Sequence, residues 1–178
     1  MKKIRPIRRA GIQDIPAICK LMNVAYRGKT GQSWTTEKDM IAGDRISPAQ
    51  LQEHLVQQNF ELWLLEGQMH AASLIGCIGI CYQGDKAEIG SFSVDPALQN
   101  QGLGKELLNF AEQHIIAHYP EIKILEMYVL SLRTELMAFY ARCGYLKTTH
   151  REEYPIHANV GTPLADLHLV QMIKVLKI

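Results

Sequence analysis

The chain has 178 residues, and 47% of them are hydrophobic. This size and composition can build one globular core without disulfides or a structural metal. The 19 Lys and Arg residues nearly balance the 18 Asp and Glu residues, so a net charge of +1 gives no overall field toward nucleic acid or an anionic membrane. The sequence shows no signal peptide, no apolar window long enough for a bilayer and no metal-type C-x-x-C pair. We expect a single cytoplasmic domain over residues 1–178, with no nucleic acid, membrane or metal partner.

The start of the chain predicts a strand and an amphipathic helix. Residues 4–8 predict a short strand, and Asp14 occupies the position of a helix N-cap, ahead of apolar residues at helical spacing through Tyr26. The segment 27–45 is polar and keeps no regular period, so we expect a loop or a broken helix. It is long for a connection, which favours a functional role.

The middle of the chain predicts a helix followed by an antiparallel meander. The residues Ser47-Pro48-Ala49-Gln50 have the pattern of a capping box with proline at the first helical position, so a short helix should run through Val56. Runs of β-forming residues, separated by turn residues, follow at residues 60–66, 74–82 and 87–94.

The second half of the chain alternates helices and strands. Apolar residues recur every fourth position from Leu103 to Ile115, which predicts a helix through His118 that Pro120 ends. The remaining predicted elements are a strand at 124–129, a helix at 134–142 and closing strands at 145–150 and 167–176.

The loop Gln99-Asn100-Gln101-Gly102-Leu103-Gly104 joins a predicted strand to a predicted helix. Its glycines let the backbone turn tightly, which leaves amide N–H groups pointing out of a helix N-terminus, where a phosphate binds well. Lys105 or Lys123 could add positive charge. Glu106 stands where a nucleotide triphosphatase needs Ser or Thr for magnesium, and no early G-x-G-x-x-G is present. The alternative is a glycine-assisted helix start without a ligand.

The string Val-Asp-Pro-x-x-Gln-x-x-Gly-x-Gly at 94–104, followed by Phe-Tyr-Ala-Arg-Cys-Gly-Tyr at 139–145, resembles the GNAT (GCN5-related N-acetyltransferase) superfamily. The resemblance is strongest from Glu88 to Tyr145. It implies an α/β (α+β) acyl-CoA N-acyltransferase fold, with a mixed, mostly antiparallel twisted sheet of about seven strands and helices on both faces. The sheet would be splayed between two central strands. Acetyl-CoA would be the co-substrate, with no metal.

The resemblance also implies the residues that would hold the cofactor. They come from the end of a strand and from the loop after it: Phe92, Ser93, Val94, Gln99, Asn100, Gln101, Gly102, Leu103, Gly104 and Lys105. Many members carry Asn near the start of the helix that holds the family tyrosine, whereas this chain has Ser131-Leu132-Arg133-Thr134-Glu135. Arg133 either reaches a cofactor phosphate or is solvated at the helix start.

Tyr140 matches the family tyrosine that protonates the departing thiolate. The alternative is a core aromatic residue in one helical stripe with Leu136 and Phe139, both of which we expect to be core. An amine nucleophile must also lose a proton, and Glu88 is the candidate base because residues 88, 90, 92 and 94 would share one strand face. The alternative is a solvated charge, with a water relay as the base.

Acceptor recognition is expected from the irregular segment that follows the first helix. Tyr26 and Trp34 would line a pocket, and Glu37 would attract a cationic amine. The alternative is a tryptophan that anchors the loop to the core beside a helix cap at Thr35 or Thr36. Arg27 and Arg45 are candidates for binding an acidic group of the substrate instead.

His114 and His118 lie one helical turn apart. A zinc site of the H-E-x-x-H type needs a Glu between them and a third ligand, and the sequence offers neither. We therefore expect two surface histidines.

The first functional hypothesis is an N-acetyltransferase that transfers an acetyl group from acetyl-CoA to a primary amine of a small molecule or peptide, by direct attack in a ternary complex. One alternative is a non-catalytic acyl-CoA sensor or interaction module on the same fold. Another is an acyltransferase that uses a longer acyl-CoA. Exposed sheet edges would also allow a homodimer.

Overall fold

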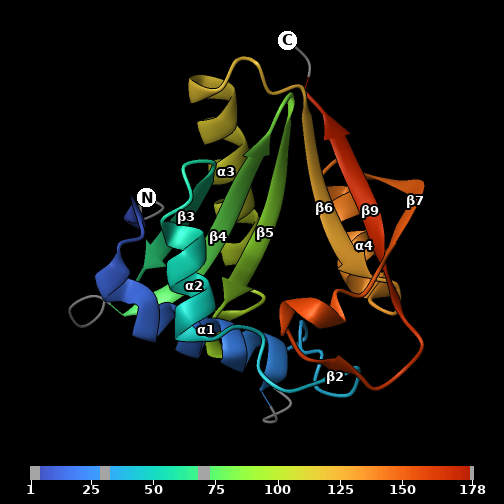
Figure 1. Cartoon of the computed structure of the whole chain (residues 1–178). Coiled ribbons are helices and arrows are strands. Elements are labelled where there is room, and N and C mark those ends of the chain that lie inside the picture. The colour runs from blue at the N-terminus through green and yellow to red at the C-terminus, as the bar shows by residue number, and fades with distance from the viewer. Residues whose placement is uncertain (1–4, 29–32, 68–72, 177–178) are drawn as a thin grey trace.

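The computed structural model describes residues 5–28, 33–67 and 73–176. Its main feature is a seven-stranded sheet in the order β1-β3-β4-β5-β6-β9-β7 (Figure 1). The strands of this sheet are β1 (Ile7–Arg9), β3 (Phe60–Glu66), β4 (Leu74–Gln83), β5 (Lys86–Val94), β6 (Ile124–Leu130), β7 (Leu146–Glu153) and β9 (His168–Val175). Neighbouring strands are antiparallel except β5 and β6, which are parallel. The mixed, mostly antiparallel sheet that the resemblance implied is confirmed.

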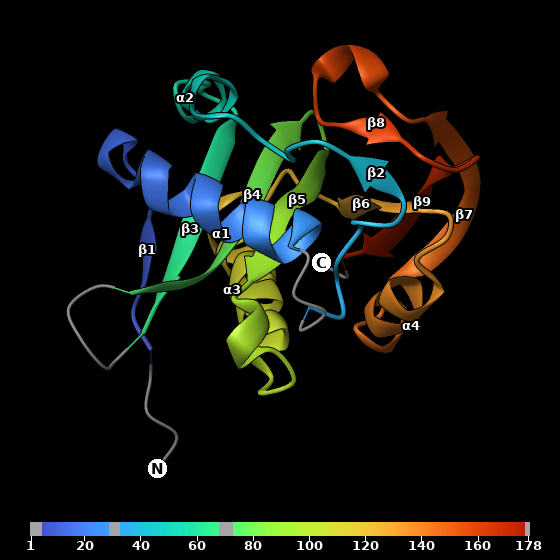
Figure 2. The same ribbon diagram turned by 90° about the horizontal axis from the view of Figure 1, so that it is seen from below.

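Helices cover both faces of the sheet (Figure 2). One face carries α1 (Ile15–Arg27) and α2 (Pro48–Leu55), and the other carries α3 (Leu103–His118) and α4 (Thr134–Arg142). Short 3-10 turns lie at Ile12–Asp14, Pro96–Leu98 and Ile156–Ala158. In the described part of the chain, none of the helices combines the length and the apolar character that crossing a bilayer requires.

Most predicted elements are confirmed, and the differences lie at element ends. The helix at 134–142 has the predicted bounds, and the Ser47 capping box closes both ways with Gln50. The first strand begins at Ile7, so the prediction that it starts at residue 4 falls partly outside the described residues. The irregular segment after α1 contains a strand, β2 (Ile41–Ala42), because it pairs with β8 (Thr162–Pro163) far along the chain.

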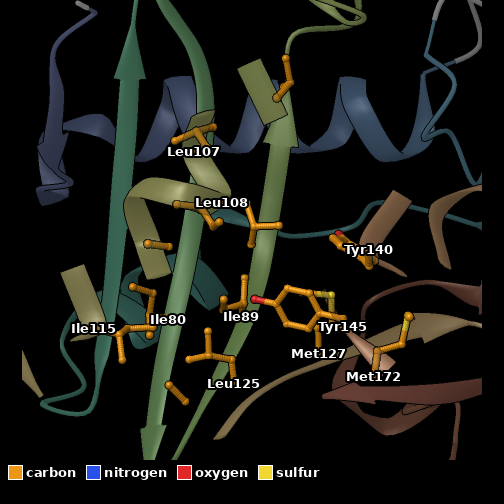
Figure 3. Close-up of a cluster of buried hydrophobic side chains, with 14 of the residues drawn as sticks. Ile80, Ile89, Leu107, Leu108, Ile115, Leu125, Met127, Tyr140, Tyr145 and Met172 are labelled. Carbon is orange, nitrogen blue, oxygen red and sulfur yellow. The ribbon is translucent and has the colours of Figure 1, made fainter. Parts of the chain in front are cut away.

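The main core lies between α3 and the sheet and continues under β6 and β9 (Figure 3). It buries Leu107, Leu108 and Ile115 of α3 against Ile80 and Ile89 of the central strands. Gly76 allows the close approach of α3, because a Cβ at this position would lie 2.7 Å from the Leu107 side chain and 3.2 Å from the Ser93 carbonyl. The close packing of α3 on the sheet fixes where the N-terminus of this helix lies.

A buried polar cluster ties α3 to the second half of the sheet. The Tyr145 hydroxyl donates to Glu112 Oε1 at 2.9 Å, and Lys174 Nζ donates to Glu112 Oε2 at 2.6 Å and to the Cys143 carbonyl at 3.1 Å. Glu112 and Tyr145 are both buried. Because the carboxylate has a cation and a hydroxyl as partners, its burial is compensated.

The two central strands separate after a short paired region (Figure 1). Pairing between β5 and β6 is confined to Lys86 with Ile124, Ala87 with Leu125 and Glu88 with Glu126. Beyond Glu88, the backbone edge of β5 therefore has no pairing partner in β6. The predicted splay between two central strands is confirmed.

A bulge in β5 corrects one prediction. Ser91 has a positive φ of 46°, and the register with β4 shifts between the pairs Gly79–Gly90 and Cys77–Ser93. The bulge adds a residue to β5, so side-chain alternation reverses along the strand. Ile89 and Val94 face α3, while Glu88 points to the other face. The prediction that residues 88, 90, 92 and 94 share a face is wrong.

Candidate active site

A cavity of about 370 Å³ lies where the end of β5, the start of α3 and one side of α4 meet. Residues of the glycine loop and two tyrosines, Tyr26 and Tyr140, contribute to its lining, and we call the part beside the two tyrosines its inner end. The residues that line it are Tyr26, Trp34, Thr35, Phe92, Val94, Gln99, Asn100, Gly102, Leu103, Gly104, Lys105, Glu135, Leu136, Phe139, Tyr140 and Arg142. We refer to this cavity as the cleft.

Residues of the glycine loop line one part of the cleft. Gly102 is the N-cap of α3 with a φ of 80°, a left-handed conformation that disfavours other residues, and a Cβ there would meet open space. The first amides of a helix have no carbonyl partner within the helix, and the helix dipole places partial positive charge there. Lys105 and Arg142 also line the cleft. These groups fit a pyrophosphate.

The side chain of Gln99 is committed to another segment of the protein. Its amide nitrogen donates to Ser33 Oγ and Thr35 Oγ1, each at 3.2 Å, and its carbonyl oxygen accepts from the backbone N–H of Trp34 at 3.1 Å. Gln99 therefore fixes the segment 33–35 beside the cleft. A side chain bound in this way leaves mainly its backbone available to a ligand.

Arg133 holds the same segment through its backbone carbonyls. It is 3% exposed, and its guanidinium donates to the carbonyl of Thr35 at 2.7 Å and to that of Trp34 at 3.2 Å. One oxygen of Glu37 lies 3.9 Å from the guanidinium. Arg133 is buried rather than solvated, and it does not line the cleft. Its role in this structure is to hold the backbone of the cleft wall.

Glu37 is likewise occupied by the protein. It is buried and forms an ion pair with Arg27, which also donates to the carbonyl of Val160 at 2.9 Å and to that of Gly43 at 3.1 Å. Glu37 is absent from the residues that line the cleft. The structure therefore places the predicted amine-attracting carboxylate inside a salt-bridged support of the loop.

Tyr140 lies at the inner end of the cleft and is 7% exposed. Burial holds the pKa of its phenol well above the ordinary value, so the hydroxyl stays protonated at working pH. Tyr26 faces the same end, where its hydroxyl donates to the carbonyl of Phe92 at 2.9 Å, and burial raises its pKa to about 12. Two protonated phenols thus stand beside the open edge of β5.

Glu88 is half-buried on β5, outside the lining of the cleft. Burial raises the pKa of its carboxyl, and the negative charges of Glu126 and Glu152 raise it further. The positive charge of Arg45 acts in the opposite direction. A carboxylate with a raised pKa is a better proton acceptor than an ordinary one.

The structure brings together most of the predicted cofactor residues and adds others. Ser93 is buried away from the cleft, where its hydroxyl has no partner among the described residues, and Gln101 is exposed outside the lining. Leu136 and Phe139, predicted as core, pack partly buried against the main core and also line the cleft. The prediction missed Thr35, Glu135 and Arg142. Glu135 and Arg142 lie on the same predicted helix as Tyr140, so that helix could have indicated them. No local sequence signal indicated Thr35.

The two histidines of α3 differ from the prediction. His118 is exposed, but His114 is partly buried, and its Nε2 lies 2.8 Å from Glu61 Oε2 of β3. Glu61 also accepts from the hydroxyls of Tyr82 and Tyr119. The prediction of two surface histidines is wrong for His114, because the packing of α3 on β3 covers it. Across the described ranges, no group of three or more His, Cys, Asp or Glu side chains is placed to hold a metal ion.

Residues 21–145 match the model of the acetyltransferase (GNAT) family. The match contains the glycine loop, the strand before it and the helix that carries Tyr140. The chain therefore belongs to this family, and it is an acetyltransferase enzyme.

Individual relatives agree with the family assignment. An amino-acid acetyltransferase of Mycobacterium tuberculosis is 27% identical over 158 residues, which are 88% of this chain and 75% of that protein. A PaiA N-acetyltransferase from Thermoplasma acidophilum, in complex with coenzyme A, shares the fold with a TM-score of 0.70 at 18% identity, over 98% of this chain and all of that chain. The N-acetylglutamate synthase of Neisseria gonorrhoeae, complexed with coenzyme A and N-acetyl-glutamate, has a TM-score of 0.66 at 20% identity, over 99% of this chain and 36% of that chain.

Proposed function

We propose that this protein, as a single domain over residues 1–178, transfers an acetyl group from acetyl-CoA to the primary amine of a small molecule or peptide by direct attack in a ternary complex. The observation that carries the proposal is the cleft, whose lining includes the N-terminus of a helix and a buried phenol, at the end of β5 that has no β6 partner.

The donor site is supported by the chemistry of the glycine loop. A pyrophosphate would accept hydrogen bonds from the first amides of α3, with Lys105 and Arg142 supplying positive charge. The pantetheine arm would extend along β5, whose edge beyond Glu88 has no β6 partner. Phe92 and Leu136 provide apolar walls for that arm.

The acetyl transfer needs three contributions at the inner end of the cleft. A backbone N–H near Val94 would polarise the thioester carbonyl, so that the negative charge of the tetrahedral intermediate is stabilised. The amine nitrogen forms a bond to the carbonyl carbon, and the carbon–sulfur bond then breaks. Tyr140 would donate a hydrogen bond and then a proton to the departing sulfur.

Glu88 would take the proton that the amine must lose, either directly or through a water. Its raised pKa suits this role, since a stronger base accepts the proton more readily. Because Glu88 does not line the cleft, we propose that the proton reaches it through a water. Glu88→Gln removes the base and leaves the size of the side chain almost unchanged.

The relatives favour a small acceptor. One is named as an amino-acid acetyltransferase, and another structure contains N-acetyl-glutamate. We propose amino acids as the first acceptors to test.

The test measures thiol release from acetyl-CoA by the purified full chain with a panel of amino acids, polyamines and short peptides. Mass spectrometry of the products identifies the acetylated amine. We expect acceptor-dependent thiol release with a mass increase on a primary amine. Acetyl-CoA binding without acceptor-dependent release across the panel would contradict the proposal.

A further inference from the structure

Arg45 holds a positive charge beside the inner end of the cleft. Its backbone is fixed, because Asn23 Oδ1 accepts from the N–H groups of Arg45 at 2.7 Å and Ile46 at 3.2 Å. Its guanidinium lies over the ring of Tyr26, 5.4 Å from the ring centroid, in a cation–π contact. Tyr26 itself lines the cleft. The cation is therefore anchored next to the reaction site.

The guanidinium of Arg45 has no hydrogen-bond or ion-pair partner within the described part of the chain. Neither an ion pair nor a side-chain hydrogen bond forms there, although the residue is half-buried. Arg27 and Arg133 differ, since their guanidinium groups are bound to carbonyls and lie close to Glu37. A partly buried guanidinium with all five donors unused is well placed to receive an acceptor from a ligand.

Glu88 is the negatively charged counterpart of Arg45. It also lacks a hydrogen-bond or ion-pair partner among the residues that the structure describes. Its acidic neighbours are occupied: Lys86 lies 3.5 Å from Glu126, and His150 lies 3.2 Å from Glu152. The charge of Arg45 acts on the pKa of Glu88, so the two groups lie within electrostatic reach of each other. Arg45 and Glu88 are therefore half-buried groups of opposite charge, and neither has a hydrogen-bond or ion-pair partner in the described chain.

We propose that Arg45 binds the carboxylate of a zwitterionic acceptor, so that the acceptor is a free α-amino acid. This inference rests on the proposed function, which supplies the donor and the reaction. The guanidinium fork matches the two oxygens of a carboxylate and fixes its orientation. A polyamine offers no group for Arg45, and the first residue of a peptide has an amide in place of the carboxylate.

The test compares free amino acids with their α-carboxamides, which keep the amine and the side chain but lose the negative charge. L-Leucine, L-glutamate and L-lysine are each paired with the matching amide in steady-state assays with saturating acetyl-CoA. Arg45→Met keeps an unbranched side chain over Tyr26 and removes the charge. We expect the variant to raise KM for the free amino acids by about 10- to 100-fold, as for loss of a charge-assisted hydrogen bond, with little change for the amides.

The controls separate recognition from folding and from the proposed function itself. Arg9→Met removes a cation on the edge strand β1, where the Arg9 side chain is 57% exposed, and should leave every constant unchanged. Arg45→Met should also keep the KM for acetyl-CoA, and Arg45→Lys should recover part of the preference. Thermal stabilisation by L-leucine in the presence of coenzyme A should be lost in Arg45→Met, which gives a readout without turnover.

Two results of the kinetic assays overturn the inference. In the first, the wild type uses amino acids and amides equally, or acetylates only polyamines or peptides, and the proposed function stands while the role of Arg45 fails. In the second, Arg45→Met raises the KM for free amino acids and for their amides alike, which would show that Arg45 acts by packing against Tyr26. Absence of acceptor-dependent thiol release with every amine contradicts the proposed function instead, and absence of stabilisation by L-leucine would then reject the Arg45 site independently.

Discussion

Two walls of the cleft, the glycine loop and the segment with Trp34 and Thr35, are held by different kinds of contact. The glycine loop, which is the proposed phosphate end, depends on local residues, because Gly102 and Gly104 lie at the start of the helix whose amides they expose. The wall formed by Trp34 and Thr35 is held instead by residues 65 and 98 positions away, Gln99 and Arg133. A local site tolerates changes elsewhere in the protein, whereas a wall built from distant contacts couples the acceptor loop to the cofactor loop and to α4.

A substitution at Tyr140, at the inner end of the cleft, should have the largest single effect on catalysis. Tyr140→Phe removes the phenolic proton and keeps the ring, so kcat should fall by about 100-fold or more, as expected for loss of a general acid. The KM for acetyl-CoA should change little. Steady-state kinetics checks both constants. Tyr119→Phe removes a hydroxyl that contacts Glu61 far from the cleft and is the matched control; equal kcat values for Tyr140→Phe and this control would remove Tyr140 from the mechanism.

Loss of Arg133 tests the wall that depends on distant contacts. Arg133→Met leaves two carbonyls and part of the Glu37 charge without their partner, so the free energy of unfolding should fall by about 2 kcal/mol. The KM for acetyl-CoA should rise as well, because Trp34 and Thr35 line the cleft. Urea unfolding and kinetics measure the two effects.

Arg8→Met is the comparison for Arg133→Met. Arg8 pairs with Asp14 and Glu66, but its side chain is 41% exposed, so the loss should be below about 1 kcal/mol. If Arg133→Met were no more destabilising than Arg8→Met and left the KM unchanged, the proposed coupling between the loop and α4 would be rejected.

The local phosphate end is tested by Gly102→Ala. The positive φ makes a Cβ unfavourable by roughly 1 kcal/mol, and the methyl group would also stand at the mouth of the anion site. Gly84→Ala in the turn between β4 and β5 has the same strain, since Gly84 has a φ of 60° and open space around it. Both variants should lose similar stability in urea unfolding, but only Gly102→Ala should raise the KM for acetyl-CoA. Matching KM values would argue against phosphate binding there.

The smallest effect concerns Glu88 and has a defined sign. Its pKa is raised in the folded protein, so the folded state holds the proton more tightly than the unfolded state does, and this contribution to stability is lost as pH rises through the raised pKa. Glu88→Gln should therefore have a higher Tm than the wild type near pH 7, because its free energy of unfolding should be larger by less than about 1 kcal/mol. The difference should vanish below the ordinary pKa of Glu. Calorimetry at several pH values gives the result, and a lower Tm near pH 7 would show that the ionised carboxylate is stabilised by the fold.

The sequence predicted the fold well because helix and strand periods are local patterns, and the phosphate site at the glycine loop stays a prediction. Period-2 runs located the meander, period-3.6 spacing located α3 and α4, and the glycine loop indicated the anion site. The bulge at Ser91 escaped the sequence pattern, since one residue with positive φ reverses side-chain alternation without altering the strand-like composition. The prediction for Glu88 was therefore based on a face that the strand does not keep.

What the sequence by itself determined was the order of elements, the family resemblance and the helix N-terminus that suits a pyrophosphate, because each depends on residues close together in the chain. What only the tertiary structure decided was which charged groups are used by the protein and which are available to a ligand. Glu37, Arg27 and Arg133 look like binding groups in the sequence, yet contacts with distant segments occupy them. Arg45 and Glu88 are half-buried charges without a hydrogen-bond or ion-pair partner in the described chain, because burial and pairing depend on neighbours that the chain brings together only on folding.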